Sequence, residues 1–176
     1  MKNVTLSAKW LGVVFAALFL VACSSNETKE AEAAAAAAAA EQAAQEAAAR
    51  EAEQQAQAAA QEAREAAAAD VGTVFYFEFD SSSLSDEARG QVDVHVAALL
   101  GNNDSIRLEG HGDERGTREY NLALGERRAN AVRDYMVANG VPSYRIETIS
   151  YGEEDPEAYG SGESNWQLNR RVEIIY

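Results

Sequence analysis

The sequence predicts an α+β domain with one mixed four-stranded sheet, helices packed on one face, and a long Ala-rich helical tether before it. Two observations predict this fold. From residue 71 onward, segments of alternating apolar residues, typical of strands, are separated by segments with apolar residues at helical spacing. Before them, residues 31–69 consist only of Ala, Glu, Gln and Arg. The order βαβαβ(α)β favours right-handed crossovers within a single sheet.

Residues 1–22 are predicted to be a lipoprotein signal peptide. They begin with a positive charge at Lys2 and Lys9, and residues 10–22 form an apolar run that is short for a bilayer span. Leu-Val-Ala before Cys23, the sole cysteine, resembles the lipobox of bacterial lipoproteins. That resemblance implies an acylated Cys23 and, because Ser24 is not Asp, sorting to the outer membrane. An ordinary signal peptide or a signal anchor is the alternative.

Residues 23–30 are expected to form the acylated N-terminus and a polar spacer, and residues 31–69 a single helix roughly 58 Å long. Ala, Glu, Gln and Arg all favour helix. Because the segment lacks large apolar side chains, we expect it not to pack strongly on the domain. A close-packed alanine coiled coil is conceivable, but alanine buries little surface, so a solvated spacer is favoured.

The domain, residues 70–176, is predicted to contain four strands and two full helices. The expected strands are residues 73–79, 105–110, 145–151 and 171–176, and the expected helices are 86–100 and 118–138. Ser85 and Thr117 precede the two helices as N-caps, and Asn139-Gly140 ends the second. Residues 163–168 are expected to form one helical turn.

The stretch from Gly110 to Val132 contains the candidate site. Asn121, Leu124 and Arg128 share one helix face, and Asp113 lies in the turn at the head of the same helix. An Asp and an Arg that meet in one cleft suit a zwitterionic ligand, because they can bind an ammonium and a carboxylate respectively. On spacing alone, an internal Asp113–Arg128 salt bridge is favoured, since ion pairs are commoner than ligand sites.

Three blocks in this domain resemble a known family. GHGDERGT at 110–117, NLALGERRANAV at 121–132 and NRRVEIIY at 169–176 resemble the OmpA-like peptidoglycan-binding domains, most closely those of the peptidoglycan-associated lipoproteins. The resemblance implies non-covalent binding of the diaminopimelate side chain of the peptidoglycan stem peptide, with Asp113 and Arg128 as the key residues. Family members usually have Thr or Ala where this chain has Gly112, so a looser turn is expected.

The same resemblance implies further contacts. Asp80, Arg115 and Thr117 match residues that contribute to the peptide pocket, and Leu124 would be its apolar wall. The alternatives are an Asx-turn at Asp80 and plain core packing of Leu124. The backbone N–H groups at the helix start could also bind a carboxylate.

The implied function is an outer-membrane lipoprotein that faces the periplasm and tethers the membrane to the cell wall, within the Tol-Pal system of cell division and envelope integrity. Its implied partners are peptidoglycan and the periplasmic propeller protein TolB, which would compete for overlapping surfaces. Two rival functions are a cell-wall hydrolase that uses paired carboxylates, and a structural lipoprotein whose Ala-rich helix is the functional part.

Composition and spacing argue against other classes. The net charge of −14 argues against nucleic acid or an anionic membrane surface as an electrostatic partner. The domain contains no evident nucleophile–base arrangement, so we expect no enzyme and no cofactor. The spacing of Asp93, His95, His111 and Asp113 does not support a metal site.

Three side assignments complete the prediction. His95, in the middle of a helix, is expected to be a buried and hydrogen-bonded histidine. Arg127, one step around the helix from Arg128, is expected at the surface. For Asn169, Arg170 and Arg171, sequence alone predicts edge-strand charges, whereas the family resemblance places this block near the pocket.

Overall fold

The computed structural model describes residues 27–176. The predicted signal peptide and Cys23 lie outside these residues. Within residues 27–176, no helix combines the length and the apolar character needed to cross a bilayer.

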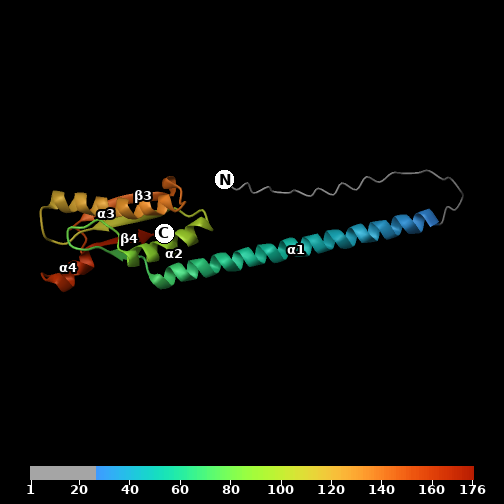
Figure 1. Ribbon diagram of the computed structural model, residues 1–176, viewed down its shortest axis with the longest axis horizontal. Coiled ribbons are helices and arrows are strands. Elements are labelled where there is room, and N and C mark those ends of the chain that lie inside the picture. Colours follow the sequence, from blue (N-terminus) through green and yellow to red (C-terminus); the bar gives the residue numbers. More distant parts are fainter. Residues whose placement is uncertain (1–26) are drawn as a thin grey trace, which may run out of the picture. The chain divides into compact units, whose positions relative to one another are not determined.

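The domain contains one four-stranded sheet with the strand order β1-β4-β2-β3. Two of its strands, β3 and β4, are labelled in Figure 1. Its strands are β1 (Val74–Tyr76), β2 (Ile106–His111), β3 (Ile146–Gly152) and β4 (Arg171–Ile175). β2 and β3 are parallel, whereas β4 is antiparallel to both β1 and β2. The predicted mixed sheet is therefore confirmed.

The helices of the domain are α2 (Asp86–Leu100), α3 (Arg118–Ala138) and the short α4 (Glu163–Asn169), with a 3₁₀ turn, η1 (Ser143–Arg145), before β3. The bounds predicted for α2 and α3 are confirmed. Both helices have the predicted caps, since Ser85 accepts from the amide of Ala88 and Thr117 from the amide of Tyr120. Local signals were sufficient here because a cap lies within three residues of its partner.

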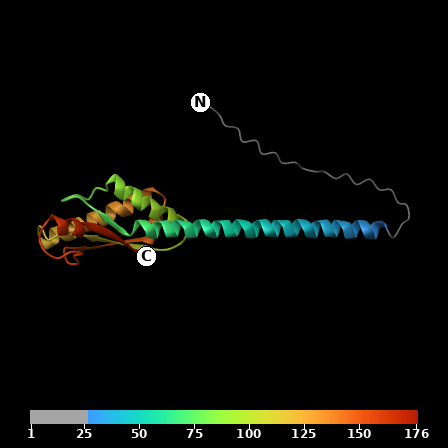
Figure 2. The ribbon, with the colours of Figure 1, turned by 90° about the horizontal axis from the view of Figure 1, so that it is seen from below.

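One face of the sheet forms the core. α3 packs against β2, β3 and β4, and α2 packs against α3 and β1 (Figures 1 and 2). The strands contribute apolar side chains to this face, and the helices fill it with their own buried residues: Phe75, Ile106, Leu108, Val172 and Ile174 from the strands, and Val92, Leu99, Val132 and Met136 from the helices. The opposite face has charged residues such as Arg107, Glu109 and Glu173, which fits a sheet that has one face on the core and the other towards solvent.

Two predictions about the strands are wrong. β1 ends at Tyr76 rather than at Phe79, because β4 begins at Arg171, the partner of Tyr76, and the bond from the amide of Phe77 to the carbonyl of Arg170 lies at the end of the pairing. The alternation of apolar residues that predicted a strand to Phe79 thus extends further along the chain than the strand that pairs with β4. In addition, β4 lies inside the sheet, so Arg170 and Arg171 are buried residues rather than charges on an edge strand.

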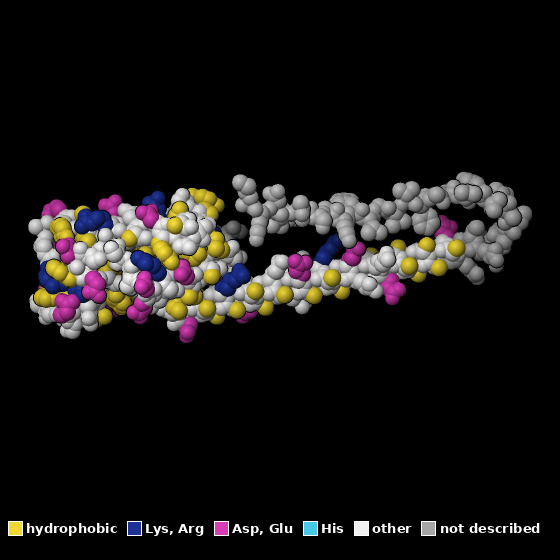
Figure 3. Space-filling model, viewed as in Figure 1, with side chains coloured by type: hydrophobic (Ala, Val, Ile, Leu, Met, Phe, Trp, Pro, Cys, Tyr) yellow, Lys and Arg dark blue, Asp and Glu magenta, His cyan; other side chains and the backbone are white. Residues whose placement is uncertain are grey.

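The tether is the helix α1 (Glu27–Val71), so helix begins within the predicted polar spacer and continues slightly past Ala69. Its alanines appear as small separate apolar spots in Figure 3. The compact unit that contains the domain begins at Arg50. In that unit, Gln61 Nε2 donates to the carbonyl of Ala98 at 3.1 Å, and Ala68 is buried. The last turns of the tether therefore contact the domain through hydrogen bonds and a small side chain, which is compatible with the expectation that the tether does not pack strongly on it.

Candidate ligand-binding site

The site lies where the turn after β2 enters α3. The position of α3 depends on a contact between two glycines, Gly110 on β2 and Gly125 on α3. A Cβ atom on Gly110 would lie 2.0 Å from the carbonyl oxygen of Gly125, and one on Gly125 would lie 2.7 Å from the oxygen of Gly110. The backbones of strand and helix therefore touch, which sets the position of every side chain on the inner face of α3.

This contact changes the interpretation of the glycines in the turn. Neither Gly110 nor Gly112 has a positive φ, so the turn does not depend on a backbone conformation that favours glycine. Gly112 donates its amide to the carbonyl of Gly152 at 2.7 Å, and a Cβ placed on it would have ordinary contacts of 3.5 Å or more with Asn121. The geometry at Gly112 is therefore compatible with a side chain, and the looser turn stays a prediction.

A cavity of about 250 Å³ lies between this turn, α3 and the segment after β1. It is lined by five of the six residues predicted for the site and by four that were not predicted: the first group is Asp80, Asp113, Arg115, Leu124 and Arg128, and the second is Phe79, Gly116, Tyr120 and Asn121. Thr117 does not line the cavity and acts as the cap of α3. Of the unpredicted residues, only Asn121 had a sequence signal, its place on the face of Arg128.

Arg128 is fully buried and its guanidinium donates only to backbone carbonyls. Its Nε bonds to the oxygen of Ser81 at 2.8 Å, and its terminal nitrogens bond to those of His111 at 2.8 Å and Glu78 at 3.3 Å. Among the ion pairs of the described residues, none joins Arg128 to a carboxylate, so the predicted Asp113–Arg128 salt bridge is wrong. Burial, with nearby Arg170 adding to it, lowers the pKa of Arg128 to about 10.

The carboxylate of Asp113 has two other arginines as partners. Arg115 donates Nε to Oδ1 at 3.0 Å and a terminal nitrogen to Oδ2 at 2.6 Å, and its backbone amide also reaches Oδ1 at 3.1 Å. Arg170 approaches Oδ2 at 3.5 Å. Burial opposes ionisation of Asp113, but the bonds from Arg115 outweigh it and hold the pKa of this carboxyl below its usual value.

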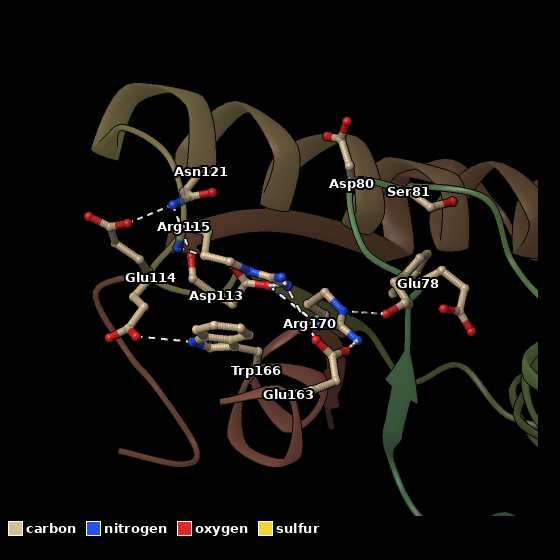
Figure 4. Close-up of polar contacts among 12 residues, drawn as sticks. Glu78, Asp80, Ser81, Asp113, Glu114, Arg115, Asn121, Glu163, Trp166 and Arg170 are labelled. Carbon is tan, nitrogen blue, oxygen red and sulfur yellow. Dashed lines mark hydrogen bonds and ion pairs between the residues drawn. The ribbon is translucent and has the colours of Figure 1, made fainter. Parts of the chain in front are cut away.

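Arg115 is itself held by two aromatic rings. Its guanidinium carbon lies 4.0 Å from the ring centre of Phe79 and 4.2 Å from that of Trp166, which fits two cation–π contacts. Trp166 belongs to α4, and its indole N–H donates to Glu114 at 3.0 Å (Figure 4). The short helix α4 is therefore tied to the turn that contains Asp113.

Asp80 forms the opposite rim of the cavity. It is the only non-glycine residue with a positive φ (+55°) among residues 27–176, a conformation that Asp tolerates better than most side chains. Its carboxylate accepts from the hydroxyl of Tyr120, and this bond raises the pKa of Tyr120. The alternative role of Asp80, an Asx-turn, is not seen among the hydrogen bonds of residues 27–176. The carboxylate instead joins the segment after β1 to the first turn of α3.

The structure also reports on the predicted positions of Arg127, His95 and Leu124. Arg127 is exposed, and His95 is buried with both ring nitrogens bonded, to Tyr176 and to the carbonyl of Gly72, as predicted. Leu124 lines the cavity while only 6% exposed, so both of its predicted roles are compatible with its position. No cluster of metal-ligating side chains is found among residues 27–176.

The comparison with known families now decides the class of the domain. The model of the OmpA family matches residues 76–170, which is more than half of the chain. The chain belongs to the OmpA family. The match contains β2, the turn with Asp113, all of α3 and Arg170, so the whole candidate site lies inside the OmpA domain.

Individual relatives agree with this assignment. The chain is 54% identical over 110 residues to peptidoglycan-associated lipoproteins of Pseudomonas putida and Pseudomonas aeruginosa, covering 62% of this chain and 66% of each relative. A crystal structure of the peptidoglycan-associated lipoprotein from Burkholderia pseudomallei is 41% identical, with a TM-score of 0.58 over 59% of this chain and 89% of that one. The OmpA-like domain of FopA1 from Francisella tularensis is 26% identical, with a TM-score of 0.51 over 57% and 68%.

Proposed function

We propose that this chain is an outer-membrane lipoprotein that binds peptidoglycan non-covalently and tethers the membrane to the cell wall, as part of the Tol-Pal system. The names of its relatives support peptidoglycan as the ligand and a lipid-anchored class. In this proposal Cys23 carries the acyl chains, the domain faces the periplasm, α1 spans the distance between them, and TolB is a second partner at an overlapping surface. No catalytic step is required.

The observation that best supports this function is that Arg128 is buried and, among the ion pairs of residues 27–176, has none with a carboxylate. Its guanidinium has five N–H donors, of which three are bonded to carbonyls, and it lines the cavity without a carboxylate partner. A buried cation gains most from a partner that supplies a full negative charge. The cavity therefore suits a ligand carboxylate, and we assign Arg128 to the carboxylate of the diaminopimelate head.

The ammonium of the same amino-acid head is assigned to Asp113, the buried acid of the cavity. Leu124 and Phe79 provide apolar walls, and Asp80 with Tyr120 closes the rim. Arg115, held between the rings of Phe79 and Trp166, also lines the cavity. Thr117, predicted to touch the stem peptide, has a supporting role as the cap that starts α3 beside the site.

Titration of a soluble stem-peptide fragment that contains diaminopimelate against the full chain tests this assignment. We expect Arg128→Lys to weaken binding at least about tenfold, because an ammonium cannot form the bidentate contact of a guanidinium. Arg127→Lys is the matched control, since it makes the same chemical change one residue away on the exposed side of α3 and should bind like the wild type.

Thermal melts of each variant separate lost binding from lost folding. If Arg128→Lys and Asp113→Asn both bind the fragment with unchanged affinity, the site assignment is wrong. Incubation with purified peptidoglycan addresses the rival hydrolase, because a binding protein retains the polymer and releases no soluble fragments.

A further inference from the structure

The carboxylate of Asp113 has no acceptor position left for a ligand. Oδ1 accepts from the amide and from Nε of Arg115, and Oδ2 accepts from a terminal nitrogen of Arg115 and is 3.5 Å from Arg170. A carboxylate offers about four lone-pair positions in total. An ammonium can therefore bind Asp113 only if one of these donors withdraws.

Of the two arginines, Arg115 is the one that can withdraw. Arg170 has a side chain only 5% exposed, and its Nε also bonds to the carbonyl of Phe77 at 2.9 Å, which holds the start of the segment after β1. The side chain of Arg115 is 29% exposed and lies on a turn. Movement of its guanidinium breaks the two side-chain bonds to Asp113, leaves the bond from the Arg115 amide in place, and removes no donor from a buried carbonyl.

A second position for the Arg115 guanidinium lies next to the first. Glu163 on α4 has an oxygen 3.8 Å from the other terminal nitrogen of Arg115, and its carboxylate is 60% exposed. The rings of Phe79 and Trp166 enclose the guanidinium of Arg115. Figure 4 shows Glu163 and Trp166 on the α4 side of Arg115. Glu114 holds Trp166 in place, as it accepts from the indole and from the hydroxyl of Ser161.

We infer that Arg115 occupies the ammonium position of the free site, and that Glu163 is the positioning residue that receives its guanidinium when a ligand ammonium takes Asp113. This inference rests on the proposed function and defines selectivity within it. The ligand ammonium replaces the ion pair between Asp113 and Arg115. Its net contribution to the binding free energy is therefore the new contact with Asp113 minus the ion pair that is lost. The ligand carboxylate replaces no such ion pair at Arg128. Affinity then depends mainly on the carboxylate, while discrimination between amino-bearing and amino-free ligands depends on Arg115 and Glu163.

The test compares two probes, a stem-peptide fragment with diaminopimelate and the same fragment with hydrogen in place of the free amino group. The measured quantity is the affinity of the full chain for the amino-bearing fragment divided by its affinity for the amino-free fragment. In Arg115→Gln the ratio should rise about fivefold to tenfold, because the ammonium no longer displaces a cation. In Glu163→Gln the ratio should fall by a similar factor, because Arg115 loses the carboxylate to which its guanidinium would move. The amide oxygen of the new Gln can still accept from Arg170, as Glu163 does now.

Glu157→Gln, the same chemical change at an exposed residue, is the matched control and should leave the ratio unchanged. If Arg115→Gln does not fold, Arg115→Met replaces it, since its apolar stem still fits between the two rings. A ratio that is unchanged or lower in the Arg115 variant would overturn the inference, including the case in which both probes weaken equally.

A measurement without ligand separates this inference from the proposed function. Titration of the Asp113 carboxyl by ¹³C NMR should show its pKa rising in Arg115→Gln and not in Glu157→Gln. If the wild type binds neither probe, the proposed function fails, and the titration still decides whether Arg115 occupies Asp113. An unchanged pKa in Arg115→Gln overturns the occupancy.

Discussion

Arg128 and Arg145 are two buried arginines with similar contacts and different surroundings. Both donate only to neutral oxygens: Arg128 to three carbonyls, and Arg145 to the carbonyls of Leu99 and Asp104 and to the side chain of Asn102. Neither forms an ion pair among those found in residues 27–176. Burial of an arginine without an acid is therefore not sufficient to identify a ligand site.

The difference lies in what balances each charge. Arg145 reaches the last turn of α2, where the helix dipole places partial negative charge on carbonyls such as that of Leu99. Arg128 bonds to the end of β2 and to the segment after β1, where no helix ends, and it faces a cavity shared with Asp113. Arg145 thus stabilises a helix end, whereas no helix end balances the buried charge of Arg128.

The largest expected effect comes from removing each arginine. Arg128→Ala and Arg145→Ala should each lower the free energy of unfolding by about 3 kcal/mol, because both leave buried oxygens without donors. Only Arg128→Ala should lower the affinity of the folded fraction for a diaminopimelate fragment. Denaturant unfolding and titrations under folding conditions measure the two quantities. A loss of affinity in Arg145→Ala beyond its loss of folded protein would remove the distinction.

A smaller effect is expected from the glycines that place α3. Gly110→Ala should destabilise the domain by about 2 kcal/mol and weaken fragment binding, because a Cβ 2.0 Å from the Gly125 oxygen must displace α3 and Arg128 with it. Gly112→Ala should be tolerated, with a gain of about 0.5 kcal/mol from the less flexible unfolded chain. Equal unfolding midpoints for the two variants would contradict the backbone contact.

The smallest effect concerns pH. Burial, together with nearby Arg171, lowers the pKa of His111, whose carbonyl binds Arg128; Glu173 and Asp155 oppose this shift, and burial also lowers the pKa of His95. Below about pH 6.5 the unfolded chain then binds more protons than the folded chain, so stability falls as the pH falls through that value towards the lowered pKa values.

The melting temperature should therefore decrease between pH 7.5 and pH 5, conditions chosen to bracket the ordinary histidine pKa of about 6.5. His111→Phe keeps a ring against Tyr151 and should reduce the decrease, while His95 accounts for the remainder. The same decrease in the wild type and in His111→Phe would show that His111 does not contribute.

The sequence by itself determined the elements whose signals are local. α2 and α3 begin and end as predicted because Ser85, Thr117 and Asn139-Gly140 act within one turn of the residues that they cap. The convergence of Asp113, Leu124 and Arg128 on one cavity also followed from helix periodicity and from the position of the turn. The family resemblance added Asp80 and Arg115.

Only the tertiary structure decided which charges pair. Asp113 binds Arg115 and approaches Arg170 instead of Arg128. Arg170 lies between α4 and β4, 57 residues away in the sequence. The carbonyls that Arg128 binds and the rings that enclose Arg115 come from three separate segments. Hydrogen bonds and ion pairs act over a few ångströms, so their partners depend on the sheet order β1-β4-β2-β3 and on the contact between Gly110 and Gly125, neither of which is encoded in local spacing.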